Sequence, residues 1–532
     1  MATLGEQIID WLEAYGVDTV FGIPGVHTVE MYRGLGSSRI HHVTPRHEQG
    51  AGFMADGYAR VTGRPGVAFV ITGPGLTNIL TPMAQAYADS VPMLVISSVN
   101  RREALGMGAG DLHEVRNPGI MAAQASAFSH TLSHPSQLPG VLARAWAVFE
   151  SARPRPVHLQ IPLDMLSEPM PPIAFTRPAP VAAPDPSSPA LEQAATTLSA
   201  AKFPLILAGG GCSDGDTLTQ LAEALDAPVV MTTNARGLLP PEHPLALAAS
   251  PTLATVRDAI RSADVVLALG TEIGRTDYDM NDQSAVEIEG TLIRVDIDPH
   301  QMMLNAVPDQ ALVGDADAVA LALLARIEGG AASGGAARAT GIRDAVRDEI
   351  GSDYRNLIGF LNVLRDTLPE AAIFGDSTNA IYAGNMAYAA PAPRRYYNAA
   401  TGYGALGYGL PAAIGAARGS GGPVICVAGD GGVQFSLTDL GTAVEEQLPL
   451  ILLIVNNQGY GEIKHWMERA QIRPVGVDLH TPDFVMIGKA YGAEATALED
   501  LTHLPEMLGE AGKRNGPTLI EIDEALILNA CA

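Results

Sequence analysis

The chain has 532 residues, of which 47% are hydrophobic and 17% are charged, and its formal net charge is −25. This length predicts about two to four domains, and the negative charge disfavours nucleic acids and anionic membranes as partners. The three cysteines lack metal-like spacing, which favours a reducing compartment. Since no apolar run is long enough to span a bilayer, we expect a cytoplasmic protein.

The first residues, TLGEQIIDWLEAYGV, predict the opening helix of a domain, because Thr3 and Glu6 form a capping-box pattern ahead of an apolar stripe. They lack a cationic segment and a long apolar core, so we do not expect a signal peptide. Farther along, the proline-rich residues 168–189 predict an extended linker. The glycine- and alanine-rich residues 328–341 predict a second, mobile segment.

These two segments divide the chain into residues 1–168, 190–327 and 342–532. In each part, short apolar β-branched runs alternate with amphipathic helical windows; examples of the runs are GVAFVIT, PLILAGG, VVLALG, PVICVAG and LILLIVNN. Such alternation is typical of parallel sheets covered by helices. We therefore predict an α/β protein built from three doubly wound parallel-sheet domains.

The N-terminal part contains two glycine-bearing turns after predicted strands, FGIPGVHT (21–28) and GPGLTN (73–78), and a helix of small residues that follows Glu48. Glycines at such points suit loops that approach a ligand. Taken alone, the RHE sequence at Glu48 is most often a solvated ion pair. Asn78 and Gln85 are candidates to face a substrate, but we expect both in satisfied polar positions of the interior.

The most informative pattern is GDGGVQFSLTDLGTAVEEQLPLILLIVNNQGYGEI, residues 429–463. Two apolar strands are predicted to end at Asp430 and Asn457, with a crossover helix between them. Because parallel strands deliver their carboxyl ends to one edge of a sheet, we expect the two side chains to meet there. Carboxylate and amide oxygens suit an octahedral Mg²⁺ that bridges a diphosphate. GDG and NN are ordinary turns when taken separately, but together they predict a metal and phosphate site.

Residues 398–417, NAATGYGALGYGLPAAIGAA, contain a literal GxGxxG, which favours a nicotinamide or flavin dinucleotide site as the alternative. We discount this alternative because the preceding RRYYNAAT makes a poor buried strand. A dinucleotide site also leaves the NN pair unexplained. GGGCSDG (209–215) is a weaker match still.

GDG, then about two dozen residues, then NN at the end of an apolar strand resemble the signature of thiamine-diphosphate enzymes. The resemblance extends over essentially the whole chain and is strongest to the acetolactate-synthase-like branch. It implies a pyrimidine-binding N-terminal domain, a central Rossmann-like domain and a C-terminal diphosphate-binding domain. It also implies a homodimer or a dimer of dimers, in which each active site takes parts from two subunits.

This resemblance implies a role for each matching residue. Mg²⁺ would be bound by the side chains of Asp430 and Asn457 and by the backbone oxygen of Gly459. Leu406 would wedge between the two rings of thiamine diphosphate, and the carbonyl of Gly404 would accept a hydrogen bond from its 4′-amino group. The residues around the diphosphate would be Gly429, Gly431, Gly432, Ser377 and Asn379.

The same resemblance makes Glu48 the acid that hydrogen-bonds N1′ of the aminopyrimidine and so activates the coenzyme. Such an acid must hold or share a proton, and burial in an apolar pocket raises the pKa of a carboxyl group. We therefore predict Glu48 as the catalytic acid, which one subunit supplies to the metal site of the other.

A 2-oxo acid is the substrate that this chemistry implies. Typical acetolactate synthases carry Phe-Gln-Glu where this chain reads GDLHEV, which places His113 at the glutamine position and keeps Glu114. A histidine there supplies a proton near neutral pH and favours decarboxylation over ligation. His27 is a second histidine of this kind, although the ordinary interpretation of either is a structural or surface residue. Glu462, on the helix after the metal loop, suits a cationic substrate tail.

The segments FGIPGVHTVEMYRGL and RHEQGAGFMADGYAR resemble enzymes assigned to 5-guanidino-2-oxopentanoate (2-ketoarginine) decarboxylation. We therefore predict that substrate, with Glu462 or Glu114 pairing its guanidinium. The alternatives are an acetolactate-synthase-like ligase, a dinucleotide-dependent oxidoreductase and a catalytically inactive scaffold. Acetolactate synthases carry a non-redox flavin, but the central segments GTEIGRTDYD and VDIDPHQM match flavin-contacting segments only in part, so FAD is a doubtful cofactor here.

Overall fold

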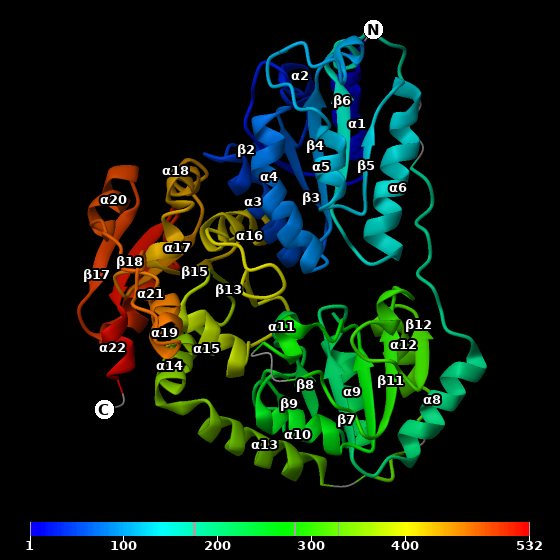
Figure 1. The fold of residues 1–532 in the computed structure, drawn as a ribbon, viewed down its shortest axis with the longest axis vertical. Helices are drawn as coiled ribbons and strands as arrows, with labels where there is room; N and C mark the ends of the chain where they lie inside the picture. The colour runs from blue at the N-terminus through cyan, green and yellow to red at the C-terminus, as the bar shows by residue number, and fades with distance from the viewer. Residues whose placement is uncertain (1, 174–176, 281–283, 328, 333, 531–532) are drawn as a thin grey trace.

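The computed structural model of the chain describes residues 2–173, 177–280, 284–327, 329–332 and 334–530. It contains three six-stranded sheets, and every pairing between their strands is parallel. Figure 1 shows the N-terminal sheet in blue, the central sheet in green and the C-terminal sheet in yellow to red, each with helices packed around it. The predicted α/β class with three doubly wound parallel sheets is confirmed.

The N-terminal sheet has the strand order β2-β1-β3-β4-β6-β5. Its strands are β1 (Thr19–Gly22), β2 (His41–Val43), β3 (Gly66–Val70), β4 (Met93–Val99), β5 (Phe128–Thr131) and β6 (Val157–Pro162). Its helices are α1 (Leu4–Ala14), α2 (Val29–Leu35), α3 (Glu48–Thr62), α4 (Pro74–Ala88), α5 (Pro118–Ala123), α6 (Leu138–Ser151) and α7 (Leu163–Leu166), with 3₁₀ turns η1 (Arg102–Ala104) and η2 (Pro135–Gln137). The predicted capping box is present, since Thr3 Oγ1 accepts from the N–H of Glu6 and Glu6 Oε2 accepts from the N–H of Thr3.

The central sheet has the order β12-β11-β10-β7-β8-β9. Its strands are β7 (Pro204–Ala208), β8 (Val229–Met231), β9 (Ala246–Leu247), β10 (Val265–Leu269), β11 (Thr291–Asp296) and β12 (Gln310–Val313). The helices are α8 (Ser188–Ala200), α9 (Gly215–Leu225), α10 (Ala254–Ser262), α11 (Arg275–Tyr278) and α12 (Ala316–Leu324), with η3 (Thr233–Ala235) and η4 (Gln301–Met303). Two buried apolar clusters cover the two faces of this sheet, which is why its strands are apolar on both sides.

The C-terminal sheet has the order β14-β13-β15-β16-β18-β17. Its strands are β13 (Ala372–Gly375), β14 (Tyr396–Asn398), β15 (Val424–Gly429), β16 (Leu450–Asn456), β17 (Glu494–Leu498) and β18 (Thr518–Asp523). The helices are α14 (Gly351–Thr367), α15 (Asn379–Ala387), α16 (Gly409–Ser420), α17 (Asp430–Val433), α18 (Leu440–Glu445), α19 (Gly461–Arg469), α20 (Phe484–Tyr491), α21 (Leu504–Ala511) and α22 (Glu524–Leu528), with η5 (Leu437–Asp439) and η6 (Leu501–His503).

The two predicted connecting segments differ in the structure. In the segment 168–189, a bridge pairs Thr3 with Pro169, and α8 begins before the segment ends. Helix α13 (Gly335–Glu349) starts inside the segment 328–341, so the part from residue 335 onward is helical. Its alanines favour a helix once the glycines have been passed. Where the three domains begin and end stays a prediction; one sheet lies within each predicted part.

The segment RRYYNAAT was predicted to make a poor buried strand, and that prediction is wrong. Residues Tyr396–Asn398 form β14, and all three are buried. Tyrosines are good strand formers because their rings pack against the neighbouring surface. β14 is nevertheless an edge strand, whereas a dinucleotide-binding GxGxxG follows a central strand, so the turn after it still does not match that alternative.

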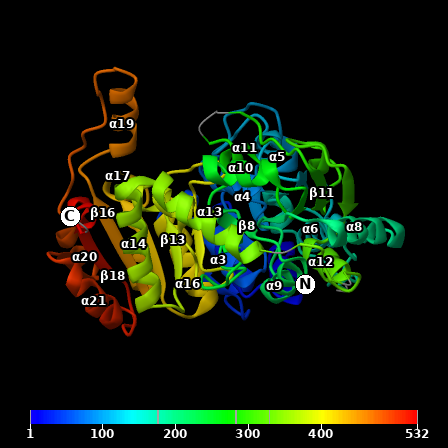
Figure 2. The ribbon, with the colours of Figure 1, turned by 90° about the horizontal axis from the view of Figure 1, so that it is seen from below.

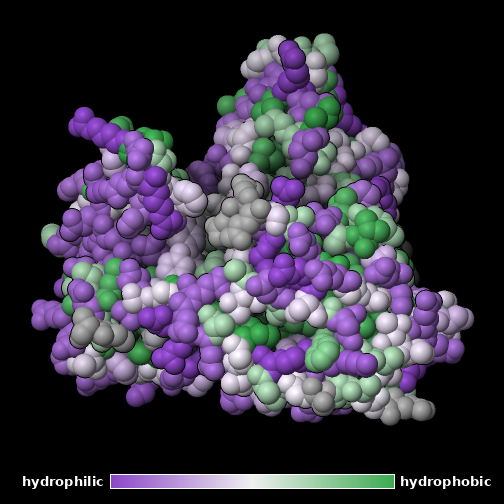
Figure 3. All heavy atoms as spheres, turned by 60° about the horizontal axis from the view of Figure 1, so that its bottom comes forward, coloured by the Kyte–Doolittle hydropathy of each residue, from purple (hydrophilic) through white to green (hydrophobic). Residues whose placement is uncertain are grey.

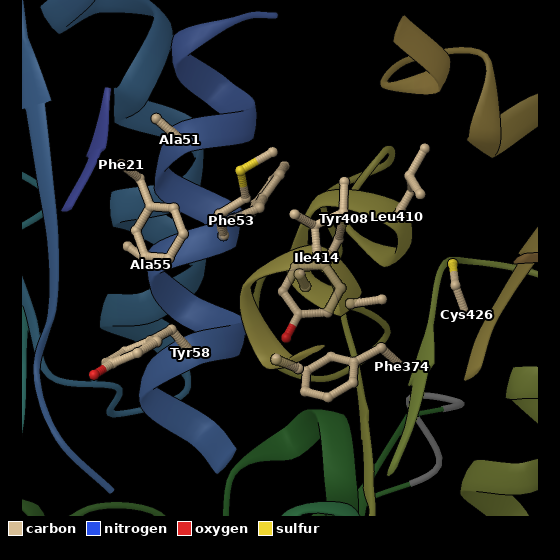
Figure 4. Close-up of a cluster of buried hydrophobic side chains, with 14 of the residues drawn as sticks. Phe21, Ala51, Phe53, Ala55, Tyr58, Phe374, Tyr408, Leu410, Ile414 and Cys426 are labelled. Carbon is tan, nitrogen blue, oxygen red and sulfur yellow. The ribbon is translucent and has the colours of Figure 1, made fainter. Parts of the chain in front are cut away.

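Helices α3 and α16 join the N-terminal and C-terminal domains into one core. Figure 4 shows Phe53 of α3 facing Tyr408 and Ile414, and all three belong to a single buried cluster. The helices approach closely, because a Cβ on Gly57 would lie only 1.9 Å from the carbonyl oxygen of Ala412. The small residues of α3 therefore serve a contact within the chain.

Figure 3 shows one face of the molecule, on which hydrophilic residues predominate and hydrophobic ones are interspersed. Among the helices that the structure describes, none combines the length and the apolar character needed to cross a membrane.

Candidate functional site

The carboxyl edge of the C-terminal sheet brings Asp430 and Asn457 together. β15 and β16 pair with Gly429 opposite Val455, so the residues that follow the two strands lie side by side. The backbone N–H of Asn457 donates to Asp430 Oδ1 at 3.3 Å, and the Thr481 hydroxyl donates to Oδ2 at 3.4 Å. Asp430 is 1% exposed, and burial raises the pKa of its carboxyl group.

The side-chain amide of Asn457 is oriented by a neighbour. Its Nδ2 donates to Oε2 of Glu524 at 3.2 Å, while its Oδ1 is buried and has no hydrogen-bond partner among the described residues. A buried polar atom left without a partner costs about 1 to 3 kcal/mol, and a bound cation would remove that cost. Glu524 is also buried, and desolvation raises the pKa of its carboxyl group. Two buried carboxylates beside a free amide oxygen fit a hard divalent cation such as Mg²⁺.

Gly459 follows in a backbone conformation that favours glycine, with φ at +152°. A Cβ there would lie 2.1 Å from the carbonyl oxygen of Val477, so a larger residue does not fit. Within the described part of the chain, no group of three or more His, Cys, Asp or Glu side chains is arranged for a metal ion. A metal at this edge would therefore need amide and backbone oxygens, as the predicted set of Asp430, Asn457 and Gly459 supplies.

The loop after β13 lies at the same edge and contains Ser377 and Asn379, the predicted diphosphate residues. Asp376, which precedes them, is fully buried. It accepts hydrogen bonds from the backbone N–H groups of Ser377 at 2.8 Å, Gly407 at 3.2 Å and Gly409 at 3.2 Å. Asp376 therefore ties this loop to the turn that leads into α16.

The glycines after β15 lie close to the same groups. A Cβ on Gly431 would lie 2.8 Å from the ring of Tyr460, and one on Gly432 would lie 3.2 Å from Asp376 Oδ1. A larger residue at position 431 would require the Tyr460 ring to move. Diphosphate binding by these two residues and Gly429 stays a prediction.

Sequence reasoning did not identify Asp376 or Glu524. Each is an acid that directly follows an apolar strand, since β13 ends at residue 375 and β18 ends at residue 523. An acid directly after an apolar strand is also the pattern that predicts Asp430. The same pattern, sought after every strand of this sheet, identifies both residues.

Gly404 and Leu406 lie in the turn before α16, against the N-terminal domain. Gly404 has φ at +77°, and no atom lies within 4 Å of a Cβ built on it. The carbonyl oxygen of Leu406 accepts from Gln49 Nε2 at 3.5 Å, and the N–H of the residue before it donates to Gln85 Oε1 at 3.2 Å. Gln85 is fully buried, in agreement with the interior position expected for it.

Glu48 is the first residue of α3 and is only partly buried in the single chain. Its Oε2 accepts from Asn78 Nδ2 at 2.9 Å, and its Oε1 would lie 3.5 Å from a Cβ on Gly75. The first turn of α4 therefore supports Glu48, and the next residue, Gln49, contacts the Leu406 turn before α16.

His27 and His113 form a pair near the same helix. Their rings are 5.3 Å apart and nearly perpendicular, at 85°. Burial lowers the pKa of His27, and the proximity of His113 adds to this effect; His27 Nδ1 is buried without a partner in the described part of the chain. A Cβ on Gly73 would lie 2.5 Å from the carbonyl oxygen of His113. His113 and Glu48 therefore flank the start of α4, although the sequence places them 65 residues apart.

The two predicted substrate glutamates have different surroundings. Glu114 accepts hydrogen bonds from the backbone N–H groups of Gly108, Gly110 and Asp111, and these lower the pKa of its carboxyl group. The Glu114 carboxylate therefore stabilises the conformation of the loop to which it belongs. Glu462 lies on α19, which stands away from the body of the domain in Figure 2, and its only hydrogen bond within the described chain comes from the Trp466 indole at 2.9 Å.

The carboxyl edge of the central sheet holds an acidic crevice of about 480 Å³. Arg153 from the N-terminal domain donates to both carboxylate oxygens of Asp296, at 2.7 and 2.6 Å, and to Glu272 at 2.7 Å. Asp277 and Asp315 also line the crevice. These carboxylates would repel an anionic ligand, and Arg153 is already paired. FAD as a doubtful cofactor stays a prediction.

Comparison with known proteins gives matches over nearly the whole chain. Three models of thiamine pyrophosphate enzymes match it: the N-terminal TPP binding domain at residues 2–121, the central domain at residues 191–323 and the C-terminal TPP binding domain at residues 377–522. The predicted resemblance is confirmed by these matches.

Curated relatives extend the comparison. The chain is 46% identical to the probable 2-ketoarginine decarboxylase AruI of Pseudomonas aeruginosa, over 98% of this chain and 94% of that protein. It is 30% identical to the large subunit of acetolactate synthase isozyme 1 of Escherichia coli, over 98% of this chain and 93% of that protein. It is also 30% identical to acetolactate synthase of Mycobacterium bovis, over 98% and 87% respectively.

Proposed function

This chain belongs to the thiamine pyrophosphate (thiamine diphosphate, ThDP) enzyme family, and on that premise we propose that it is a ThDP- and Mg²⁺-dependent 2-oxo acid decarboxylase. The observation that carries the proposal is the unpaired Oδ1 of Asn457 beside the buried carboxylate of Asp430. These two side chains, with the backbone oxygen of Gly459, would hold Mg²⁺. Ser377, Asn379 and the glycines after β15 would hold the diphosphate.

Bound ThDP supplies an acidic carbon and an electron sink for the loss of CO₂. Glu48 would hold a proton at N1′ of the pyrimidine, and Asn78 keeps its carboxyl group in place through the 2.9 Å hydrogen bond. Leu406 would pack against the rings of the bound coenzyme. His113 would deliver a proton to the carbon that has lost CO₂, with His27 beside it, so that the product is an aldehyde.

The proposed substrate is 5-guanidino-2-oxopentanoate, and the product is then 4-guanidinobutanal. Support comes from the 46% identical relative, whose name is probable 2-ketoarginine decarboxylase. Glu462 would pair the guanidinium, because among the described residues its carboxylate accepts a hydrogen bond only from Trp466 and keeps acceptor capacity for a charge-assisted pair. Glu114 is a weaker choice, since three backbone N–H groups already occupy its carboxylate.

A second candidate is an acetolactate-synthase-like ligase, which the 30% identical relatives favour. A panel of 2-oxo acids with added ThDP and Mg²⁺ separates the two. We expect the guanidino acid to be turned over fastest, with one aldehyde formed per CO₂. Acetolactate from pyruvate as the main product would instead support the ligase, and no CO₂ release from any 2-oxo acid would contradict the proposal.

We further propose that the enzyme is a homodimer, or a dimer of dimers, with Glu48 and Asp430 of each site on different subunits. In support, the family resemblance implies shared sites, and α19 and the loop after it expose Ile463, Trp466 and Ile472. Mixing inactive Glu48→Gln and Asp430→Asn subunits tests this. Shared sites predict roughly a quarter of the parent activity after random reassembly, since a mixed dimer regains one intact site. No recovery in verified mixed dimers would mean that each site lies within one chain.

A further inference from the structure

Glu524 is placed to act on the metal site without being one of its proposed ligands. β18 pairs in parallel with β16, with Asp523 opposite Asn456, so Glu524 emerges at the same edge as Asn457. It is 7% exposed. Its position at the start of α22 leaves the carboxylate directed into the site, where it meets two amides.

Each oxygen of the Glu524 carboxylate accepts a hydrogen bond from a different asparagine. Oε1 accepts from Asn379 Nδ2 at 2.9 Å, and Oε2 accepts from Asn457 Nδ2 at 3.2 Å. An ionised carboxylate has no proton to donate, so each amide must present its NH₂ group to it. The amide oxygen of Asn457 is then turned away from Glu524, which is why it is left without a partner.

We propose that Glu524 is a positioning residue that holds the amide oxygen of Asn457 toward Mg²⁺ and the side chain of Asn379 toward the diphosphate. This inference rests on the proposed function. Without the carboxylate, the amide of Asn457 is free to rotate by half a turn, which would present NH₂ to the cation. Partners that orient a metal ligand are worth about 10- to 100-fold in metal affinity.

The neighbouring pair Asn456 and Glu521 offers a matched control. Asn456 Nδ2 donates to Glu521 Oε1 at 2.8 Å, on the same two strands. The Asn456 amide oxygen, however, accepts from the backbone N–H of Gln458 and is therefore already committed. Glu521→Gln removes the same charge from the same sheet edge without altering Asn457.

The test measures Mn²⁺ binding in the presence of ThDP, by the loss of the free Mn²⁺ signal in electron paramagnetic resonance, on the full-length protein. Glu524→Gln has one acceptor and one donor group, so it can satisfy only one of the two asparagines. We expect its apparent Mn²⁺ affinity to fall about 10- to 100-fold, while Glu521→Gln stays within about twofold of the parent and both variants keep the parent melting temperature within a few degrees.

A double variant distinguishes orientation from general damage. In Glu524→Gln with Asn457→Asp, the new carboxylate has two equivalent oxygens, so one accepts from the glutamine NH₂ and the other faces the metal. The total charge equals that of the parent. We expect Mn²⁺ affinity to recover to within a few fold of the parent, whereas Asn457→Asp alone, with two carboxylates facing each other, does not bind as well as the double variant.

Three results overturn the inference alone. The first two are Glu524→Gln binding Mn²⁺ as tightly as the parent, and the double variant binding no better than Glu524→Gln. An equal loss in Glu521→Gln also overturns it, because the effect is then one of charge at the sheet edge. If the parent itself shows no ThDP-dependent Mn²⁺ binding, the proposed function fails and the inference fails with it.

Discussion

The C-terminal and central sheets share a doubly wound parallel architecture, but their carboxyl edges are opposite in character. At the C-terminal edge, Asp430 has only neutral hydrogen-bond donors, and the amide oxygen of Asn457 has no partner among the described residues. At the central edge, both carboxylate oxygens of Asp296 accept from Nη2 of Arg153, which belongs to another domain. The carboxylate at the central edge is thus paired with a guanidinium, whereas the hydrogen-bond donors to Asp430 are neutral.

This difference indicates that the fold determines where a ligand can bind. The charges at the carboxyl edge of the sheet then determine whether one binds. At the central edge, the buried carboxylate of Asp296 is neutralised by Arg153 of the same chain. The C-terminal edge retains buried negative charge, and such charge is tolerated when a metal compensates it. The four predictions below test this contrast, in order of decreasing effect on turnover.

Asp430→Asn should remove the contrast altogether. The variant loses the charged ligand, so we expect ThDP-dependent decarboxylation to fall to the level of a control without coenzyme. Stability should rise or stay the same, because a desolvated carboxylate has been removed. Circular dichroism melting and CO₂ release measure the two effects, and a variant with appreciable Mg²⁺-dependent turnover would contradict the metal assignment.

Glu48→Gln should affect chemistry without affecting binding. The glutamine keeps the contact with Asn78 but has no proton to share, so we expect kcat to drop by about 10²- to 10⁴-fold. The affinity for ThDP, measured by calorimetry, should change only slightly. Equal kcat in the variant and the parent at saturating ThDP would contradict the role of Glu48 as the catalytic acid.

Glu462→Gln should alter selectivity rather than the general rate. Losing a charge-assisted pair costs about 1.5 to 3 kcal/mol, so kcat/KM for the guanidino acid should fall about 10- to 100-fold relative to that for an aliphatic 2-oxo acid. Glu468→Gln, on the same helix, is the matched control. An unchanged ratio of the two kcat/KM values would remove Glu462 from the substrate site.

Arg153→Met should leave turnover nearly unchanged and reduce stability. Breaking a buried ion pair from one side costs about 3 to 5 kcal/mol, because Asp296 is then buried without its partner. We expect a lower melting temperature, partly restored by adding Asp296→Asn, and ThDP affinity within about twofold of the parent. A loss of ThDP affinity as large as that of Asp430→Asn would show that the two edges are not independent.

Much of the fold was predictable because parallel strands buried on both faces read as continuous apolar runs. Asp430 and Asn457 were predictable for the same reason, since each directly follows such a run. The role of Glu524 was not, because its partners Asn379 and Asn457 lie 145 and 67 residues away in the chain. The residue at which α13 begins depends on the balance between the helix-favouring alanines and the helix-disfavouring glycines of this segment. The composition of the segment does not show where that balance changes.

The central claim is that this chain uses Mg²⁺-bound ThDP to decarboxylate a guanidino 2-oxo acid. The most direct measurement is CO₂ release from 5-guanidino-2-oxopentanoate by protein stripped of metal and coenzyme, before and after both are added back. We predict no release from stripped protein, little when ThDP or Mg²⁺ is added alone, and full release with 4-guanidinobutanal formation when both are present. Equal release from the stripped and the replenished protein would contradict the account.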